Sequence, residues 1–109
     1  MAPARFTPEV TDALLTREKA RGRELRRSPW WKRRIAAGIC HYCRRHVGTK
    51  GLTMDHVVPL IRGGRSVRGN TVPACKDCNS KKQSLLPWEW AEYLRRGGGA
   101  EQDWRPGPS

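Results

Sequence analysis

The first third of the chain has the pattern of a charged helix with few apolar positions. Within residues 8–27 the apolar side chains form one thin helical stripe, made of Val10, Leu14, Leu15 and Leu25. We predict a helix here, with Gly22 as its weakest point because glycine is a poor helix former. A shorter helix is predicted over residues 29–37, since Ser28 offers an N-cap acceptor and Pro29 loses no hydrogen bond at the first helical position.

The pattern changes to short apolar segments separated by turns after the first cysteine. Residues 52–58 are apolar and β-branched enough for a strand, which Pro59 would end. A basic, glycine-rich loop follows over residues 62–69, and then a short extended segment over residues 71–74. A polar helix is predicted to reach about residue 84, and a last helix to span residues 87–96. These elements predict a small α+β protein.

The composition limits how such a protein can fold. Leucine, isoleucine, valine and phenylalanine make up fewer than a fifth of the 109 residues, against a formal net charge of +12. Composition alone would permit disorder, because little apolar surface is available to offset the entropy of ordering the chain. Folding therefore needs a metal, disulfides or a partner. Residues 97–109, rich in glycine, proline and charge, are predicted to be disordered.

Basic residues are concentrated in one block. Residues 17–45 contain 11 lysines and arginines but only two acidic residues, Glu18 and Glu24. Such a block attracts nucleic-acid phosphates, although a solvated helix face has the same composition. The block lacks the broad apolar face of a membrane-surface helix. No signal peptide or membrane span is recognisable, which predicts an intracellular, cytoplasmic protein without membrane contact.

Two Cys-x-x-Cys pairs predict a zinc site. Cys40 and Cys43 form the first pair, Cys75 and Cys78 form the second, and 31 residues separate the two pairs. Four thiolates suit one tetrahedral Zn²⁺ and leave no open coordination position, so this metal would be structural. Two disulfides or a redox dithiol are the alternatives, and an intracellular chain disfavours stable disulfides.

An ordered set of residues lies between and after these pairs. It comprises Asp55, His56, Pro59, Gly63, Gly64, Asn70, Asn79 and Lys82. Together with the cysteines, this set resembles the HNH endonuclease family over roughly residues 40–93. The resemblance implies a ββα-metal (His-Me finger) nuclease core over residues 40–96, held by a zinc site of four cysteines. A basic helical extension, residues 1–39, would precede this core, and the tail would follow it.

The resemblance also implies a role for each residue of the set. His56 would be the general base, and Asp55 would lie on the opposite side of the same strand because side chains alternate there. Asp55 and Asn79 would bind the catalytic cation, Mg²⁺ or Mn²⁺, in an HNN variant whose last residue is histidine in many relatives. Asn70 would hold the loop around His56, and Lys82 would contact a phosphate. Further phosphate contacts are expected from the basic block at Lys32, Arg33 and Arg34.

The function implied is that of a metal-dependent endodeoxyribonuclease that hydrolyses DNA phosphodiesters. Its partner would be DNA, and it would act as a monomer or homodimer. Small relatives of this kind accompany phage packaging, restriction and mobile-element genes, so a bacterial or phage setting with other DNA-processing proteins is expected. The alternative is a noncatalytic zinc-ribbon module that binds DNA or a protein, since each polar residue taken alone could be structural.

Overall fold

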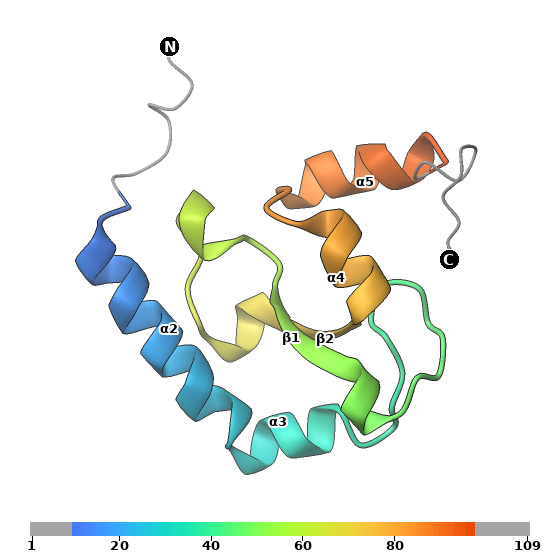
Figure 1. Ribbon diagram of the computed structural model, residues 1–109, viewed down its shortest axis with the longest axis horizontal. Helices are drawn as coiled ribbons and strands as arrows, with labels where there is room; N and C mark the ends of the chain where they lie inside the picture. The colour runs from blue at the N-terminus through green and yellow to red at the C-terminus, as the bar shows by residue number, and fades with distance from the viewer. Residues whose placement is uncertain (1–9, 98–109) are drawn as a thin grey trace.

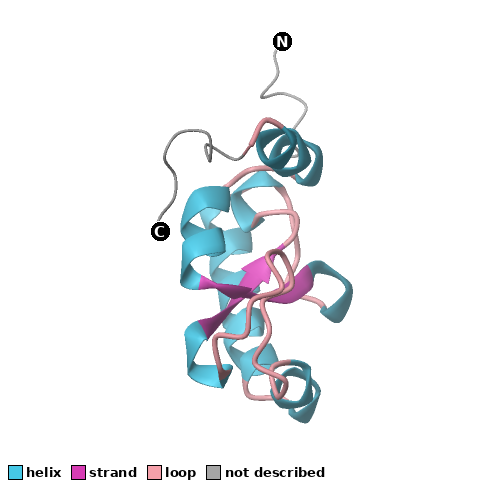
Figure 2. Cartoon of the chain, turned by 90° about the vertical axis from the view of Figure 1, so that its right-hand side faces the viewer, coloured by secondary structure: helices cyan, strands magenta, loops and turns pink. Residues whose placement is uncertain are grey.

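The structure of the protein is a computed structural model, in which residues 10–97 are described. Its helices and strands are α2 (Asp12–Arg26), α3 (Pro29–Arg34), β1 (Leu52–His56), β2 (Thr71–Cys75), α4 (Lys76–Lys82) and α5 (Pro87–Arg95). The predicted α+β class is confirmed (Figures 1 and 2). The predicted start of the first helix at residues 8–9 and the predicted tail from residue 98 lie outside the described residues. The division at residues 39 and 96 stays a prediction.

The two strands form an antiparallel hairpin whose register sets the position of the polar residues. Asp55 is paired with Val72, and His56 is paired with Thr71. The strand β1 ends at His56, two residues earlier than predicted. One further bond follows in register, from Val57 N to Asn70 O at 2.9 Å. The pairing then stops because Asn70 N donates to Val67 O and Val58 N donates to Asn70 Oδ1, both at 2.9 Å.

The first two helices begin where side-chain caps place them. Thr11 Oγ1 accepts from Leu14 N at 3.1 Å, and Ser28 Oγ accepts from Trp31 N at 3.2 Å. The second helix, α3, is three residues shorter than predicted and ends at Arg34. In α2 the fully buried residues are Glu18 and Gly22, whereas Leu14, Leu15 and Leu25 of the apolar stripe are partly buried. The closest packing of this helix therefore involves a carboxylate and a glycine.

Sulfur rather than aliphatic carbon lies at the centre of the core. Cys40, Cys75 and Cys78 form a buried cluster with Ala74 between the strands and α4. Tyr42, Val47 and Leu52 pack around this cluster. The shortage of branched aliphatics thus coincides with a core in which cysteines occupy the buried positions.

The segment between the strands, residues 57–70, lies between α2 and the sheet (Figure 1). Asn70 closes it: its Nδ2 donates to Val58 O at 3.0 Å and to Arg65 O at 2.9 Å. Gly64 is packed so tightly against this closure that a Cβ atom there would lie 1.7 Å from Val58 O and 2.9 Å from Asn70 Nδ2. The backbone of this loop can therefore follow its path only with glycine at position 64.

We predict that Gly64→Ala destabilises the protein by about 3 kcal/mol or more, the upper end of overpacking penalties. The backbone carbonyl that the new methyl group meets cannot move without breaking the Asn70 closure. Gly69→Ala is the matched control, because a Cβ atom at position 69 meets no atom within 4 Å. That control should change stability by less than about 0.5 kcal/mol. Equal unfolding free energies for the two variants in urea titrations would contradict this account.

Candidate active site and zinc site

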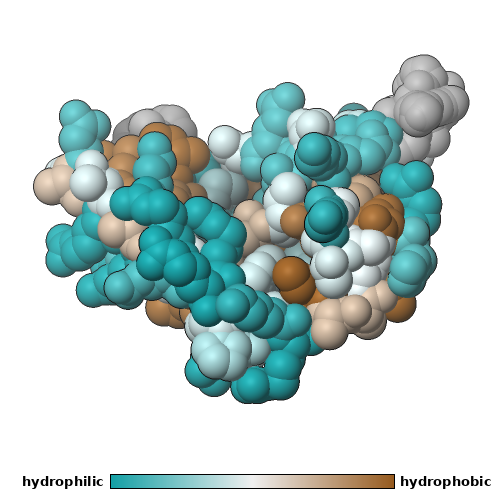
Figure 3. Space-filling view, turned by 60° about the horizontal axis from the view of Figure 1, so that its bottom comes forward, coloured by the Kyte–Doolittle hydropathy of each residue, from teal (hydrophilic) through white to brown (hydrophobic). Residues whose placement is uncertain are grey.

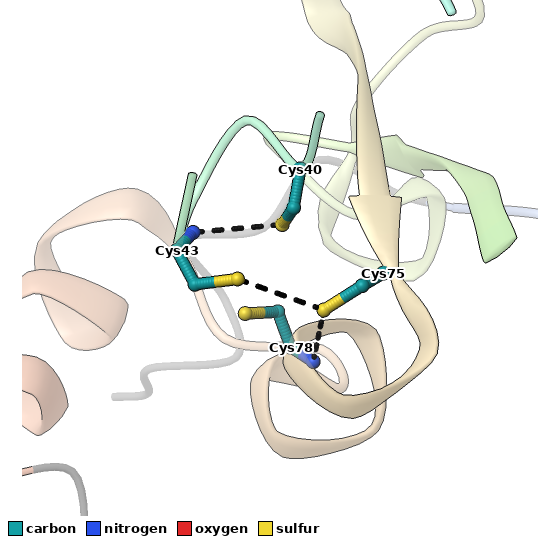
Figure 4. Close-up of side chains that lie close together, drawn as sticks. All are labelled: Cys40, Cys43, Cys75 and Cys78. Carbon is teal, nitrogen blue, oxygen red and sulfur yellow. Dashed lines mark hydrogen bonds between the residues drawn. The ribbon is translucent and has the colours of Figure 1, made fainter. Parts of the chain in front are cut away.

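The four cysteine sulfurs converge from three segments of the chain (Figure 4). Cys40 and Cys43 lie in the turn after α3, Cys75 ends β2, and Cys78 lies in the first turn of α4. All four are free thiols, their sulfurs lie within 4.8 Å of one another, and Cys43 Sγ is 3.8 Å from Cys75 Sγ. A tetrahedron with Zn–S bonds of about 2.3 Å has sulfurs about 3.8 Å apart. The cluster therefore fits a metal such as zinc.

The surroundings of the cysteines shift the pKa values of their thiols in different directions. Burial raises the pKa of Cys75 and, with the neighbouring sulfurs, that of Cys78. Burial also acts to raise the pKa of Cys43, but hydrogen bonds from Arg45 outweigh it and lower this pKa to about 7. Arg45 Nε lies 3.3 Å from Cys43 Sγ. A bound cation would stabilise the Cys75 and Cys78 sulfurs as thiolates against this effect of burial.

Asp55 lies near the end of β1 and is 6% exposed. Its Oδ2 accepts a hydrogen bond from Tyr42 Oη at 2.6 Å and forms an ion pair with Lys82 Nζ at 3.1 Å. Burial and the bond to Asp55 raise the pKa of Tyr42, so the phenol remains a hydrogen-bond donor. Because Tyr42 lies between Cys40 and Cys43, one hydrogen bond links the cysteine cluster to this carboxylate.

Lys82 is buried next to Asp55. Its side chain is 1% exposed, and its ammonium donates to His56 O at 3.1 Å and to Val57 O at 3.2 Å as well as pairing with Asp55. With these three oxygen partners, the lysine fixes the end of β1 and balances the charge of Asp55. Its predicted phosphate contact stays a prediction.

His56 points toward a different set of partners from its neighbour Asp55. Its Nε2 lies 2.8 Å from Ser66 Oγ, and Ser66 is in turn bonded to Glu18 of α2. Burial lowers the pKa of His56 below its ordinary value of 6.5, although the negative charge of Asp55 acts to raise it. The imidazole is therefore neutral at pH 7 and able to accept a proton.

Asn79 lies on α4, three residues before Lys82, and is partly exposed. Residues three apart share a helix face, so Asn79 lies one turn from the lysine that contacts Asp55 and His56. The helix α4 packs against both strands. The structure thus brings Asp55, His56 and Lys82 together at the end of β1, with Asn70 closing the loop behind them and Asn79 on the neighbouring turn of α4.

Residues 40–90 match a protein-family model described as HNH endonuclease. This segment of the chain belongs to the HNH endonuclease family. No curated protein matched the chain. Membership supports a nuclease-type function in general. Within the part of the chain that the structure describes, no helix has the length and apolar character needed to cross a membrane.

The matched segment, residues 40–90, does not include α2 or α3. Even so, α2 contacts the polar centre, by which we mean Asp55, His56 and the side chains bonded to them. α2 supplies Glu18, the partner of Ser66. α3 carries the three exposed cations Lys32, Arg33 and Arg34, and Arg68 of the loop lies over the Trp30 ring at 5.4 Å. Figure 3 shows that hydrophilic residues spread over much of the face on which α3 lies.

Sequence reasoning missed three residues that are linked to Asp55 or His56 by hydrogen bonds: Tyr42, Ser66 and Glu18. Tyr42 stands between two cysteines of the cluster, and that position was the only signal available. Ser66 and Glu18 are 48 residues apart and carry no motif. Glu18 nevertheless stands out as one of only two acidic residues in the basic block. Tertiary packing alone brings these side chains to Asp55 and His56.

Two substitutions are predicted to show that the cysteine cluster and the polar centre have different roles. Cys75→Ser should lose bound zinc and most of its helical circular dichroism, because one ligand of the core is removed. Asn79→Ala should keep about one zinc per chain and a native spectrum, since Asn79 is not part of the cysteine cluster. Metal analysis and circular dichroism on the purified variants provide the measurements. A folded, fully zinc-loaded Cys75→Ser protein would contradict this assignment.

Proposed function

We propose that the protein is a metal-dependent endonuclease that hydrolyses phosphodiester bonds in DNA. The observation that carries the proposal is the pair Asp55 and His56 at the end of β1. The two side chains are adjacent in sequence but held by separate partners, Asp55 by Tyr42 and Lys82, and His56 by Ser66. A proton acceptor and a potential cation ligand therefore lie side by side within a segment of the HNH endonuclease family.

In this proposal His56 acts as the general base. Its neutral imidazole takes a proton from a water molecule, whose oxygen attacks the phosphorus atom. The bond from phosphorus to the 3′ oxygen breaks, and the leaving oxygen takes a proton from solvent, which gives a 5′-phosphate and a 3′-hydroxyl. The burial that keeps His56 unprotonated near neutral pH supports this role.

Asp55 and Asn79 would hold the divalent cation. The donor set fits Mg²⁺ or Mn²⁺, because both residues offer hard oxygen ligands. Both protein contacts of Asp55 are made to Oδ2, so we assign Oδ1 to the cation. When bound, the cation would stabilise negative charge on the phosphate and the leaving oxygen. Tyr42 and Lys82 would hold the carboxylate in a fixed orientation for it.

The exposed cations of α3 would contact the DNA backbone. Lys32, Arg33 and Arg34 all lie in exposed positions. Contacts of this kind position a protein on DNA without reading its sequence. The stacking of Arg68 on Trp30 connects α3 to the loop that Asn70 closes, so these cations would be held at a fixed place relative to His56.

One observation favours a second candidate function. The Asp55 carboxylate already has a cationic partner, Lys82, at 3.1 Å. Its charge is therefore balanced without a metal ion. A noncatalytic zinc module that binds DNA or a protein would require nothing further of Asp55. The two candidates differ in whether the protein cleaves DNA and whether cleavage depends on His56.

Conversion of supercoiled plasmid to nicked or linear DNA tests the proposal. We expect cleavage with Mg²⁺ or Mn²⁺, and a loss of about 10²–10⁴-fold in His56→Ala because the base is removed. His46→Ala is the matched control, since His46 is exposed and follows the first cysteine pair. Equal cleavage by His56→Ala and the unsubstituted protein would refute the proposal. So would the absence of cleavage with either metal, which would favour the noncatalytic module.

The pH dependence of cleavage follows from the environment of His56. Because burial lowers its pKa below 6.5, the active neutral form is populated at pH 7 and is lost only as the pH falls through that lowered pKa. The rate should therefore be nearly constant just above pH 6.5 and decrease on the acidic side. A pH series of initial rates at saturating Mg²⁺ measures this limb. An acidic limb centred well above pH 6.5 would contradict the burial argument.

A further inference from the structure

We infer that α2 is part of the active site, because Glu18 and Ser66 select the tautomer of His56 and thereby direct its basic nitrogen. This inference rests on the proposed function of His56 as general base. It assigns a positioning role to two residues, one of which lies outside the HNH segment of the chain. The hydrogen bonds around His56 decide which of its two ring nitrogens is free to accept a proton.

The hydrogen bonds form a chain with one possible direction. Ser66 Oγ lies 2.6 Å from the backbone carbonyl oxygen of Glu18 and 2.8 Å from His56 Nε2. The carbonyl oxygen can only accept a hydrogen bond, so the single hydroxyl proton of Ser66 is donated to it. Ser66 Oγ must then accept from His56, and Nε2 therefore carries a proton. In the neutral ring, Nδ1 is consequently the nitrogen with the free lone pair.

The backbone of Ser66 is held by the same glutamate. Ser66 N donates to Glu18 Oε1 at 2.7 Å, and the two residues are 6% and 1% exposed. Arg21 and Arg65 lie 3.3 Å and 3.8 Å from Glu18 Oε2 and balance its charge. A buried carboxylate with these partners stabilises one position of Ser66. This role accounts for an acidic side chain inside the basic block.

Close packing of α2 keeps the chain of hydrogen bonds short. A Cβ atom at Gly22 would lie 3.2 Å from Ser66 Oγ and 3.9 Å from His56 Cε1. Glycine at this position therefore lets the helix approach both side chains, at the cost of helix propensity. The residue that weakens α2 as an isolated helix is the one that allows α2 to reach the imidazole.

The tautomer can be measured without any cleavage reaction. Long-range ¹H–¹⁵N spectra of the zinc-loaded, full-length protein, recorded without DNA at a pH above the pKa of His56, report which ring nitrogen is protonated. We expect a single neutral form with the proton on Nε2. In Ser66→Ala the form with the proton on Nδ1 should appear, because its acceptor constraint is removed. Ser84→Ala, which changes an exposed serine outside the chain of hydrogen bonds, should leave the spectrum unchanged.

Kinetics provide the second measurement. Ser66→Ala should lower kcat for DNA cleavage by about 10–100-fold, the loss typical of removing a residue that orients a functional histidine. KM and bound zinc should stay unchanged, as they should in Ser84→Ala. Loss of kcat in Ser66→Ala with an unchanged spectrum would overturn the inference, as would a Nδ1 proton in the unsubstituted protein.

The same experiments separate this inference from the proposed function. If His56→Ala cleaves DNA as well as the unsubstituted protein, the proposed function fails, whatever the spectra show. If His56→Ala is inactive while Ser66→Ala keeps both full kcat and a single Nε2 proton, the proposed function stands and the positioning role fails.

Discussion

The convergence of four cysteine sulfurs is the constraint on which the fold depends. They join the turn after α3, the end of β2 and the start of α4, three segments that contain little apolar surface of their own. A two-stranded hairpin is marginally stable by itself. A metal on these sulfurs would replace the missing hydrophobic core, because its binding free energy becomes folding free energy.

The polar centre is attached to this cluster through Tyr42. The phenol donates to Asp55 on one side and packs edge-to-face against Trp90 of α5 on the other, with ring centroids 5.5 Å apart. Trp90 in turn stacks on Tyr93 at 5.4 Å. Lys82 of α4 forms an ion pair with the same carboxylate. Since removing one partner of a buried ion pair costs about 3–5 kcal/mol, the orientation of Asp55 is tied to the packing of both C-terminal helices.

Much of the local structure was readable from the chain. Ser28 and Pro29 start α3 as their residue types predict, because a cap needs only neighbouring backbone amides. The cysteine spacing likewise predicted the cluster. The end of β1 was predicted too late, since the side chain of Asn70, far along the chain from His56, takes the Val58 amide out of the ladder. The burial of Lys82 could not be predicted, because its position in the motif carries no information about burial.

Residue types and their spacing were enough to specify the local elements, the metal-binding chemistry of the cysteines and membership of the HNH endonuclease family over residues 40–90. Each of these properties can be read from short stretches of the chain. Tertiary packing was needed to show that Lys82 is buried against Asp55 and that α2 reaches His56 through Ser66. The physical reason is that these contacts join residues 10 to 48 positions apart. Their geometry depends on how the helices pack around the hairpin, which no local pattern records.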